Sequence, residues 1–161
     1  MAPRTRRQML EVGEKAPSFQ LRDLEGQEQS SADILAPGPA IFAFFKTTCP
    51  TCQFTFPYLD RLKKHSDVPI YGISQDDRET TLEFNEEFGV TFPTLLDPKP
   101  AYQASNGFAI THVPSIFVVE KDGTVSFASD GFSRRDLESL GRRVGVEIFQ
   151  PGEYVPEWKA G

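Results

Sequence analysis

Apolar residues along this chain gather in short runs that are separated by polar and turn-forming residues. The run at 40–45 (AIFAFF) follows Pro39 and contains only apolar residues, and the run at 69–74 (PIYGIS) is built in a similar way. Short runs rich in aromatic or β-branched residues are typical of strands buried inside a sheet. The segment 92–97 (FPTLLD) predicts a further short extended piece before Pro98.

Two pairs of extended runs are joined by turn dipeptides, and each pair predicts a β-hairpin. The runs 115–120 (SIFVVE) and 124–128 (TVSFA) flank an Asp-Gly dipeptide, which is preferred where a tight turn joins two antiparallel strands. Near the N-terminus, 19–22 and 27–30 flank a Glu-Gly dipeptide and predict a smaller hairpin.

Three segments carry apolar residues at the spacing of one helix face. The first, 50–64, has an apolar stripe made of Phe54, Tyr58, Leu59 and Leu62. The second is predicted to begin at Asp76, with Glu79 three positions on, and to end at Gly89. Its apolar residues are Leu82, Phe84 and Phe88. The third opens with Ser133 as its cap, and its buried stripe is predicted to be Leu137, Leu140 and Val144.

The order of these segments is strand, helix, strand, helix, hairpin and helix. Strands that alternate with helices pair in parallel, whereas a hairpin pairs its strands antiparallel. The pattern therefore predicts one α/β domain with a mixed central β-sheet, helices on both faces and a small N-terminal β-hairpin. We assign residues 12–149 to this domain, 1–11 to a basic N-terminal arm and 150–161 to a C-terminal tail. Tyr154 and Trp158 of the tail are expected to pack on the domain.

Both cysteines of the chain, Cys49 and Cys52, lie where the strand at 40–45 leads into the following helix. A helix N-terminus has unpaired N–H groups and a partial positive charge, which stabilise a thiolate. Pro50 suits the first helical position, because that position needs no N–H donor. We therefore predict that Cys49 is the exposed nucleophile. Cys52, shielded by the first helical turn, would resolve a mixed disulfide formed at Cys49.

The formal net charge of the chain is −6 and its sequence pI is about 5.0. This acidic balance disfavours nucleic acid or an anionic membrane surface as a partner. Arg4, Arg6 and Arg7 form a basic start, but no apolar export-signal stretch follows, and no run reaches the length of a membrane span. A cytoplasmic location is therefore expected. In that reducing compartment, paired cysteines are more often catalytic or metal-binding than structural.

A zinc site is another chemistry open to two cysteines. It would have to combine Cys49 and Cys52 with the chain's two histidines, His65 and His112. Structural zinc sites commonly use a second closely spaced pair of ligands, and these histidines lie far apart in the sequence. We therefore predict no metal and no cofactor.

Four segments of the chain together resemble the thioredoxin superfamily. They are residues 12–26 (VGEKAPSFQLRDLEG), 44–52 (FFKTTCPTC) with Pro57 behind it, 92–98 (FPTLLDP) and 108–123 (FAITHVPSIFVVEKDG). The likeness is to the TlpA/ResA-like branch, within the wider group that includes alkyl hydroperoxide reductase-type peroxiredoxins. A CxxC motif alone is moderately specific; followed by Val-Pro before a strand and by an Asp-Gly hairpin, it is a strong signal. The resemblance implies a thioredoxin-like fold and a thiol–disulfide oxidoreductase.

The resemblance also implies which residues face the cysteines. Pro114 would form a cis peptide bond with Val113 and expose the Val113 backbone, so that an incoming peptide could pair with it. Pro50 and Thr51, between the cysteines, would complete the substrate-binding surface and tune the reduction potential. The expected partners are a disulfide-containing protein or small-thiol substrate and a thiol reductant that the sequence does not identify.

The chain departs from the family pattern at positions that serve proton transfer. Thioredoxins carry an Asp six residues before the first cysteine, where this chain has Ala43. Some ResA-like proteins carry a Glu three residues after the second cysteine, where this chain has Thr55. Peroxiredoxins need a Thr three residues before the peroxidatic cysteine, and here that residue is Lys46. Two alternatives stay open: a peroxiredoxin-like thiol peroxidase with Cys49 peroxidatic and Cys52 resolving, and a redox-inert thioredoxin-like binding module.

Overall fold

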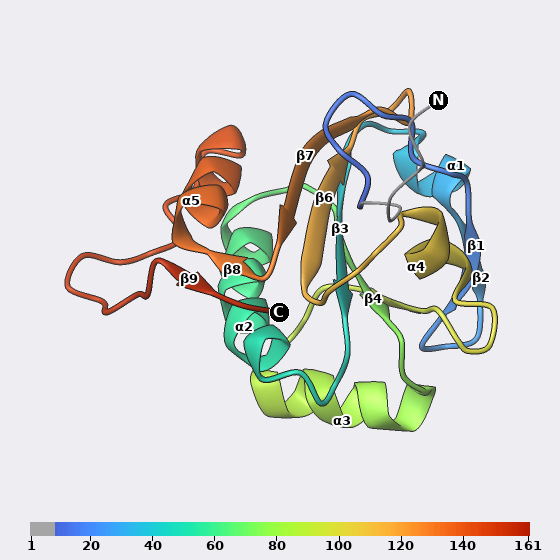
Figure 1. The fold of residues 1–161 in the computed structure, drawn as a ribbon, viewed down its shortest axis with the longest axis horizontal. Helices are drawn as coiled ribbons and strands as arrows, with labels where there is room; N and C mark the ends of the chain where they lie inside the picture. The colour runs from blue at the N-terminus through green and yellow to red at the C-terminus, as the bar shows by residue number, and fades with distance from the viewer. Residues whose placement is uncertain (1–8) are drawn as a thin grey trace, which may run out of the picture.

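A seven-stranded sheet forms the centre of the molecule in the computed structural model, which describes residues 9–161 (Figure 1). The strand order is β2-β1-β5-β4-β3-β6-β7. The strands are β1 Gln20–Asp23, β2 Glu28–Ser30, β3 Ala40–Phe45, β4 Ile70–Ser74, β5 Thr94–Leu96, β6 Ser115–Val119 and β7 Val125–Asp130. Arg4, Arg6 and Arg7 of the predicted basic arm lie outside the described residues.

The sheet is mixed, as the order of segments in the sequence predicts. β3, β4 and β5 pair in parallel, whereas β6 and β7 are antiparallel to their neighbours. The N-terminal hairpin of β1 and β2 joins the same sheet, because β1 pairs antiparallel with β5. Within residues 9–161, no helix combines the length and the apolar composition that crossing a bilayer would require.

Helices cover both faces of the sheet (Figure 1). One core cluster takes side chains from α2 Pro50–His65, α3 Arg78–Phe88 and α5 Arg134–Arg143. The other takes side chains from α1 Ser31–Leu35 and α4 Gln103–Gly107. The predicted α/β fold, with helices on both faces of a mixed sheet, is confirmed.

The central strand β3 separates the two cores through the alternation of its side chains. Ile41, Ala43 and Phe45 belong to the cluster on the α2 face. Phe42 and Phe44 belong to the cluster on the opposite face. Successive side chains of a strand point to opposite faces, so a strand covered on both sides is apolar throughout. The run AIFAFF is therefore explained by its place in the middle of the sheet.

The start of α3 differs by one residue from the prediction. Asp77, not Asp76, is the N-cap, and its side chain accepts a hydrogen bond from the Thr80 N–H at 2.8 Å. Leu82, predicted to be part of the apolar face, is 37% exposed. The adjacent Thr81 is fully buried instead, which is possible because its hydroxyl forms a hydrogen bond inside the protein.

The C-terminal tail packs on the domain in a different way from the prediction. Tyr154 and Trp158 are 89% and 64% exposed, so the expectation that they pack on the domain is wrong. Val155 is the buried apolar residue of this stretch. The tail instead adds a strand: β9 Trp158–Lys159 pairs antiparallel with β8 Phe132–Ser133, just before α5. Backbone pairing therefore fixes the last residues while the large side chains stay outside.

Candidate active site

The CxxC pair lies at the junction between β3 and α2. Cys49 is the N-cap of α2 and Pro50 is its first residue, as the sequence predicts. The Cys49 Sγ accepts a hydrogen bond from the Cys52 N–H at 3.1 Å. This N–H lies at a helix N-terminus, where backbone donors can stabilise negative charge that develops on the sulfur during a reaction.

The two sulfur atoms have different surroundings. Cys49 is half-buried, whereas Cys52 is fully buried among apolar side chains. Burial raises the pKa of the Cys52 thiol, and the hydrogen bond with Cys49 acts in the same direction. A sulfur that stays protonated and inaccessible cannot be the first to attack a substrate. The geometry therefore separates an accessible thiol from a shielded one three residues later.

The loop before Cys49 is held by a carboxylate from another strand end. The N–H and the hydroxyl of Thr47 both donate to one Asp76 oxygen, at 2.7 and 2.9 Å. The Gln53 amide donates to the Thr47 carbonyl at 3.0 Å and so ties the loop to α2. Sequence reasoning missed Asp76 in this role, because its partner is 29 positions away.

The segment 112–114 faces the cysteines from the start of β6. The Val113–Pro114 bond is cis. The Cys49 Sγ donates a hydrogen bond to the Val113 carbonyl oxygen at 3.5 Å. The Pro114 carbonyl accepts a hydrogen bond from the Gly131 N–H at 2.8 Å. The structure thus brings the Val113–Pro114 segment to the Cys49 sulfur, where the resemblance places it.

Pro50 and Thr51 occupy the first turn of α2 at the protein surface. The Pro50 side chain is exposed, and Thr51 is half-buried. The Thr51 hydroxyl does not face the sulfurs; it donates to the backbone carbonyl of Ala160 in the tail. This contact was not expected from the sequence, in which Ala160 lies 109 positions after Thr51.

Position 43 and position 55 carry no acid. Ala43 and Thr55 are both fully buried, and Ala43 belongs to the same core cluster as Cys52. The Thr55 hydroxyl donates to the Thr51 carbonyl within α2. Among the described residues, the two buried carboxylates are Asp60 and Asp97.

Both of these buried carboxylates accept hydrogen bonds away from the cysteines. Asp60 accepts from the N–H and hydroxyl of Thr91, at 2.7 and 2.9 Å. Asp97 accepts from the backbone N–H groups of Ala104 and Ser105, at 3.0 and 2.7 Å, and so caps α4. The hydrogen-bond partners of both carboxylates are therefore residues other than the cysteines.

The histidines do not join the cysteines. His65 ends α2, about 20 Å along the helix axis from Cys52 at the usual rise per residue. The His112 Nδ1 lies 3.1 Å from the Thr111 hydroxyl and 3.9 Å from an Asp130 oxygen. In the part of the chain that the structure describes, no three His, Cys, Asp or Glu side chains form a metal-binding group. Cys49, Cys52, His65 and His112, which were weighed as a zinc ligand set, are thus not brought together.

Comparison with known proteins places this site in a family. A model of the AhpC/TSA family matches residues 12–128, which is most of the chain and includes the CxxC motif and Pro114. The chain belongs to the AhpC/TSA family. The likeness read from the sequence segments is therefore confirmed at the family level.

Within the AhpC/TSA family, the chain is similar to proteins named thiol–disulfide oxidoreductase ResA. The protein of that name from Geobacillus kaustophilus is 30% identical over 139 residues, which cover 83% of this chain and 78% of the relative. The one from Geobacillus thermodenitrificans is 31% identical over 125 residues, covering 75% of this chain and 70% of the relative.

Solved structures of several thioredoxin-like proteins share the fold of this chain. A thio-disulfide isomerase from Thermus thermophilus is 28% identical, with a TM-score of 0.67 over 86% of this chain and 99% of that one. A protein described as a thiol:disulfide interchange protein DsbE, from Chlorobium tepidum, has a TM-score of 0.72 at 22% identity and covers 84% and 96% of the chains. Peroxidoxin BcpB from Mycobacterium tuberculosis has a TM-score of 0.67 at 18% identity, covering 83% and 92%. Fold alone therefore does not separate an oxidoreductase from a peroxidase.

Proposed function

We propose that this protein is a thiol–disulfide oxidoreductase in which Cys49 attacks the substrate and Cys52 resolves the intermediate. The observation that carries this proposal is the contrast between the two sulfurs. Cys49 is accessible and its sulfur accepts a hydrogen bond from the Cys52 N–H, whereas Cys52 is fully buried behind the first turn of α2. The family and the oxidoreductase relatives support the same reaction class.

The reaction begins at the Cys49 sulfur. Its thiolate attacks one sulfur of a substrate disulfide, forming a Cys49–substrate disulfide and releasing the other substrate sulfur as a thiolate, which takes a proton from water. Cys52 then loses its proton and attacks the Cys49 sulfur. That step forms the Cys49–Cys52 disulfide and releases the second substrate thiolate. Two electrons pass from the protein to the substrate, and a dithiol reductant returns them in the reverse sequence.

The proposed partners follow from this chemistry and from the site residues. The substrate is a disulfide of a protein or a small thiol, bound against Val113, Pro114, Pro50 and Thr51. The reductant is a thiol whose identity the site does not specify. The cytoplasmic location expected from the sequence stays a prediction.

An insulin reduction assay with dithiothreitol tests this proposal. Wild-type protein is expected to accelerate insulin reduction, and Cys49→Ser to abolish the acceleration. Cys52→Ser is expected to stall as a Cys49 mixed disulfide. Hydrogen peroxide is expected to oxidise Cys49 slowly, because Lys46 stands where peroxiredoxins carry a threonine.

Two results would contradict the proposal in different ways. Fast oxidation by peroxide with weak insulin reduction would support the thiol peroxidase. No reaction of the protein with either substrate would support the redox-inert binding module.

A further inference from the structure

The last residues of the chain lie against the proposed active site. The tail strand β9 pairs with β8 in the register Phe132↔Lys159. Ala160 then accepts a hydrogen bond from the Thr51 hydroxyl, within the CxxC turn. A Cβ on Gly161 would collide with the carbonyl oxygen of Val113. Gly161 therefore packs against the same carbonyl group that the Cys49 thiol contacts.

The tail rests on a surface that is built from three elements. We call it the tail-binding surface and define it by Thr51 and Phe54 of α2, Val113, and the segment 131–133 that contains β8. The Lys159 ammonium lies 5.0 Å from the centre of the Phe54 ring, a cation–π contact. A Cβ on Gly131 would come within 2.6 Å of the Lys159 carbonyl oxygen. A glycine at 131 therefore permits the close approach of the two backbones.

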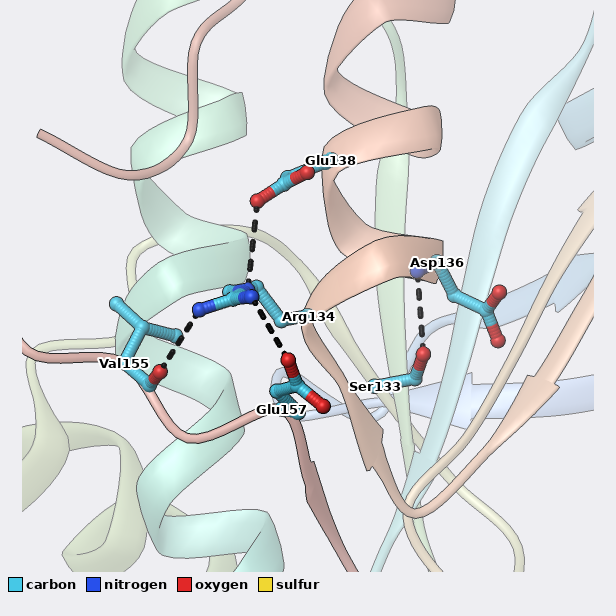
Figure 2. A network of polar contacts seen from close by, with 6 residues as sticks. All are labelled: Ser133, Arg134, Asp136, Glu138, Val155 and Glu157. Atoms are coloured by element: carbon cyan, nitrogen blue, oxygen red, sulfur yellow. Dashed lines mark hydrogen bonds and ion pairs between the residues drawn. The ribbon is translucent and has the colours of Figure 1, made fainter.

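The start of the tail strand is fixed by Arg134 (Figure 2). Its guanidinium donates to the Val155 carbonyl and to a Glu157 oxygen, each at 3.3 Å. Its backbone N–H donates to the Glu157 carbonyl at 2.9 Å. Glu138, one turn along α5, forms an ion pair with the same guanidinium, and the nitrogen–oxygen distance is 3.7 Å. These contacts direct residues 157–161 along β8 and towards Val113.

The geometry of the tail is that of a bound peptide. It is extended, it pairs by backbone with β8, which pairs with no other described strand, and it ends at the Val113 backbone next to the Cys49 sulfur. Strand addition of this kind binds extended peptides through their main chain and reads side chains at alternate positions. The Phe54 ring contacts the side chain at one of these positions, and its cation–π contact favours a basic residue there.

We propose that residues 157–161 act as an internal competitor: they occupy the tail-binding surface until an extended segment of a disulfide-containing polypeptide displaces them. This inference rests on the proposed function for the identity of the substrate. The substrate segment carries a basic residue in the position of Lys159 and lies along β8. A small disulfide needs only the Cys49 sulfur, so the tail hinders it less.

The full-length double variant Lys159→Pro, Gly161→Val tests the proposal. Arg134 and Glu157 form a hydrogen-bonded step of the ladder, so Lys159 is the next residue whose N–H pairs with β8, and proline removes that donor. Valine at 161 adds the collision with Val113. Tyr154→Ser is the matched control, since it changes the same tail at a side chain that is 89% exposed.

Reaction rates of the reduced proteins with insulin and with 2-hydroxyethyl disulfide provide the first readout. If the tail covers the surface in about nine molecules of ten, opening it raises the insulin rate about tenfold, because apparent affinity scales with the competent fraction. The rate with 2-hydroxyethyl disulfide and both rates of Tyr154→Ser should stay within about twofold of wild type. An insulin rate unchanged in the double variant would overturn the proposal.

Peptide binding gives a second readout that needs no redox reaction. A synthetic peptide with the sequence of residues 156–161 (PEWKAG) is titrated into ¹⁵N-labelled protein. Backbone amide signals of Thr51, Val113 and Gly131 should shift in the double variant and not in wild type at the same peptide concentration. Absence of shifts in the double variant would refute the surface. If neither disulfide reacted with any variant, the proposed function would fail, and this titration would still decide whether the surface binds peptides.

Discussion

At the scale of single residues, Cys49 and Cys52 share a motif but not an environment. The first sulfur lies at a helix N-terminus beside the Val113 carbonyl. The second is enclosed by the core, where burial raises the pKa of its thiol. Resolution of a mixed disulfide needs the Cys52 thiolate, so this step depends on a base. The neighbouring Ala43 and Thr55 cannot serve, because neither side chain takes up a proton near neutral pH.

The pH dependence of resolution follows from the raised pKa of Cys52. Below that pKa, the thiolate fraction grows about tenfold per pH unit, so the resolution rate of a preformed Cys49 mixed disulfide should rise with that slope above neutral pH. Ala43→Asp should speed resolution at pH 7, because position 43 is on the α2 face of β3. Stopped-flow mixing across pH measures both effects.

A matched variant separates the base from the polarity of the new side chain. Ala43→Asn has nearly the shape of Ala43→Asp but takes up no proton, so it should resolve no faster than wild type. Both variants are expected to be destabilised by about 2 kcal/mol or more through burial of a polar group at a fully buried position. A wild-type rate that is already flat at neutral pH would show that another base serves Cys52.

At the scale of elements, the active-site loop depends on the junction between β4 and α3. Asp76 follows β4 and accepts two hydrogen bonds from Thr47. Asp77, the next residue, caps α3. Two adjacent acids thus serve two elements: one holds the loop before Cys49, and the other starts a helix.

Replacement of Asp76 should weaken both the fold and the reactivity of Cys49. Asp76→Ala leaves the buried N–H and hydroxyl of Thr47 without their acceptor, which is expected to lower the free energy of unfolding by about 1–3 kcal/mol. The alkylation rate of Cys49 by iodoacetamide should fall as the loop loosens. Urea unfolding and mass spectrometry measure the two quantities.

Asp77→Ala is the control for this prediction. It removes the cap of α3 and is expected to reduce stability without changing the alkylation rate of Cys49, since Asp77 bonds to Thr80 and not to the active-site loop. Equal alkylation rates in wild type and Asp76→Ala would show that Thr47 does not position Cys49.

The elements that were predicted well have signals that are local in sequence. The uninterrupted run 40–45 and the CxxC-Pro pattern specify the central strand and the start of α2 without reference to distant residues. The start of α3 was misplaced by one position because Asp76 and Asp77 are both suitable caps. The hydrogen bond from Thr47 to Asp76 determines which of the two acids is left to cap α3, and that contact is not local in sequence.

At the scale of the whole molecule, the tail is held to the domain by two arginines. The Arg61 guanidinium binds both oxygens of Glu153 at 2.8 Å, and it also donates to the Ile148 carbonyl at 2.9 Å. Arg134 holds the tail further on through Glu157. Sequence patterns predicted apolar docking of Tyr154 and Trp158, since large aromatic residues usually become buried. Instead of apolar docking, ion pairs and strand pairing hold the tail. Neither interaction produces a periodic pattern of residues in so short a sequence.

The Arg61–Glu153 pair gives the protein an acid-dependent contribution to stability. The hydrogen bond with Arg61 lowers the pKa of Glu153 below its ordinary value of 4.5. A carboxyl whose pKa is lower in the folded state stabilises the fold above its unfolded pKa, and this contribution is lost as pH falls through the folded pKa. Glu153→Gln should therefore lower Tm at pH 7 and have no effect well below pH 4.

Thermal unfolding of wild type and Glu153→Gln across pH measures this difference. Glu147→Gln serves as the control, because that glutamate is exposed and belongs to the same region of the chain. A Tm difference between wild type and Glu153→Gln that persists unchanged at low pH would contradict the role of the charge.

The central claim is the division of labour between the two cysteines, and trapping of the mixed disulfide tests it most directly. Reduced Cys52→Ser and reduced Cys49→Ser are each mixed with a disulfide-containing polypeptide and analysed by intact-mass and peptide mass spectrometry. Cys52→Ser should accumulate one covalent adduct at Cys49, whereas Cys49→Ser should form none on the same timescale. An adduct at Cys52, or equal adducts in both variants, would contradict this division of roles.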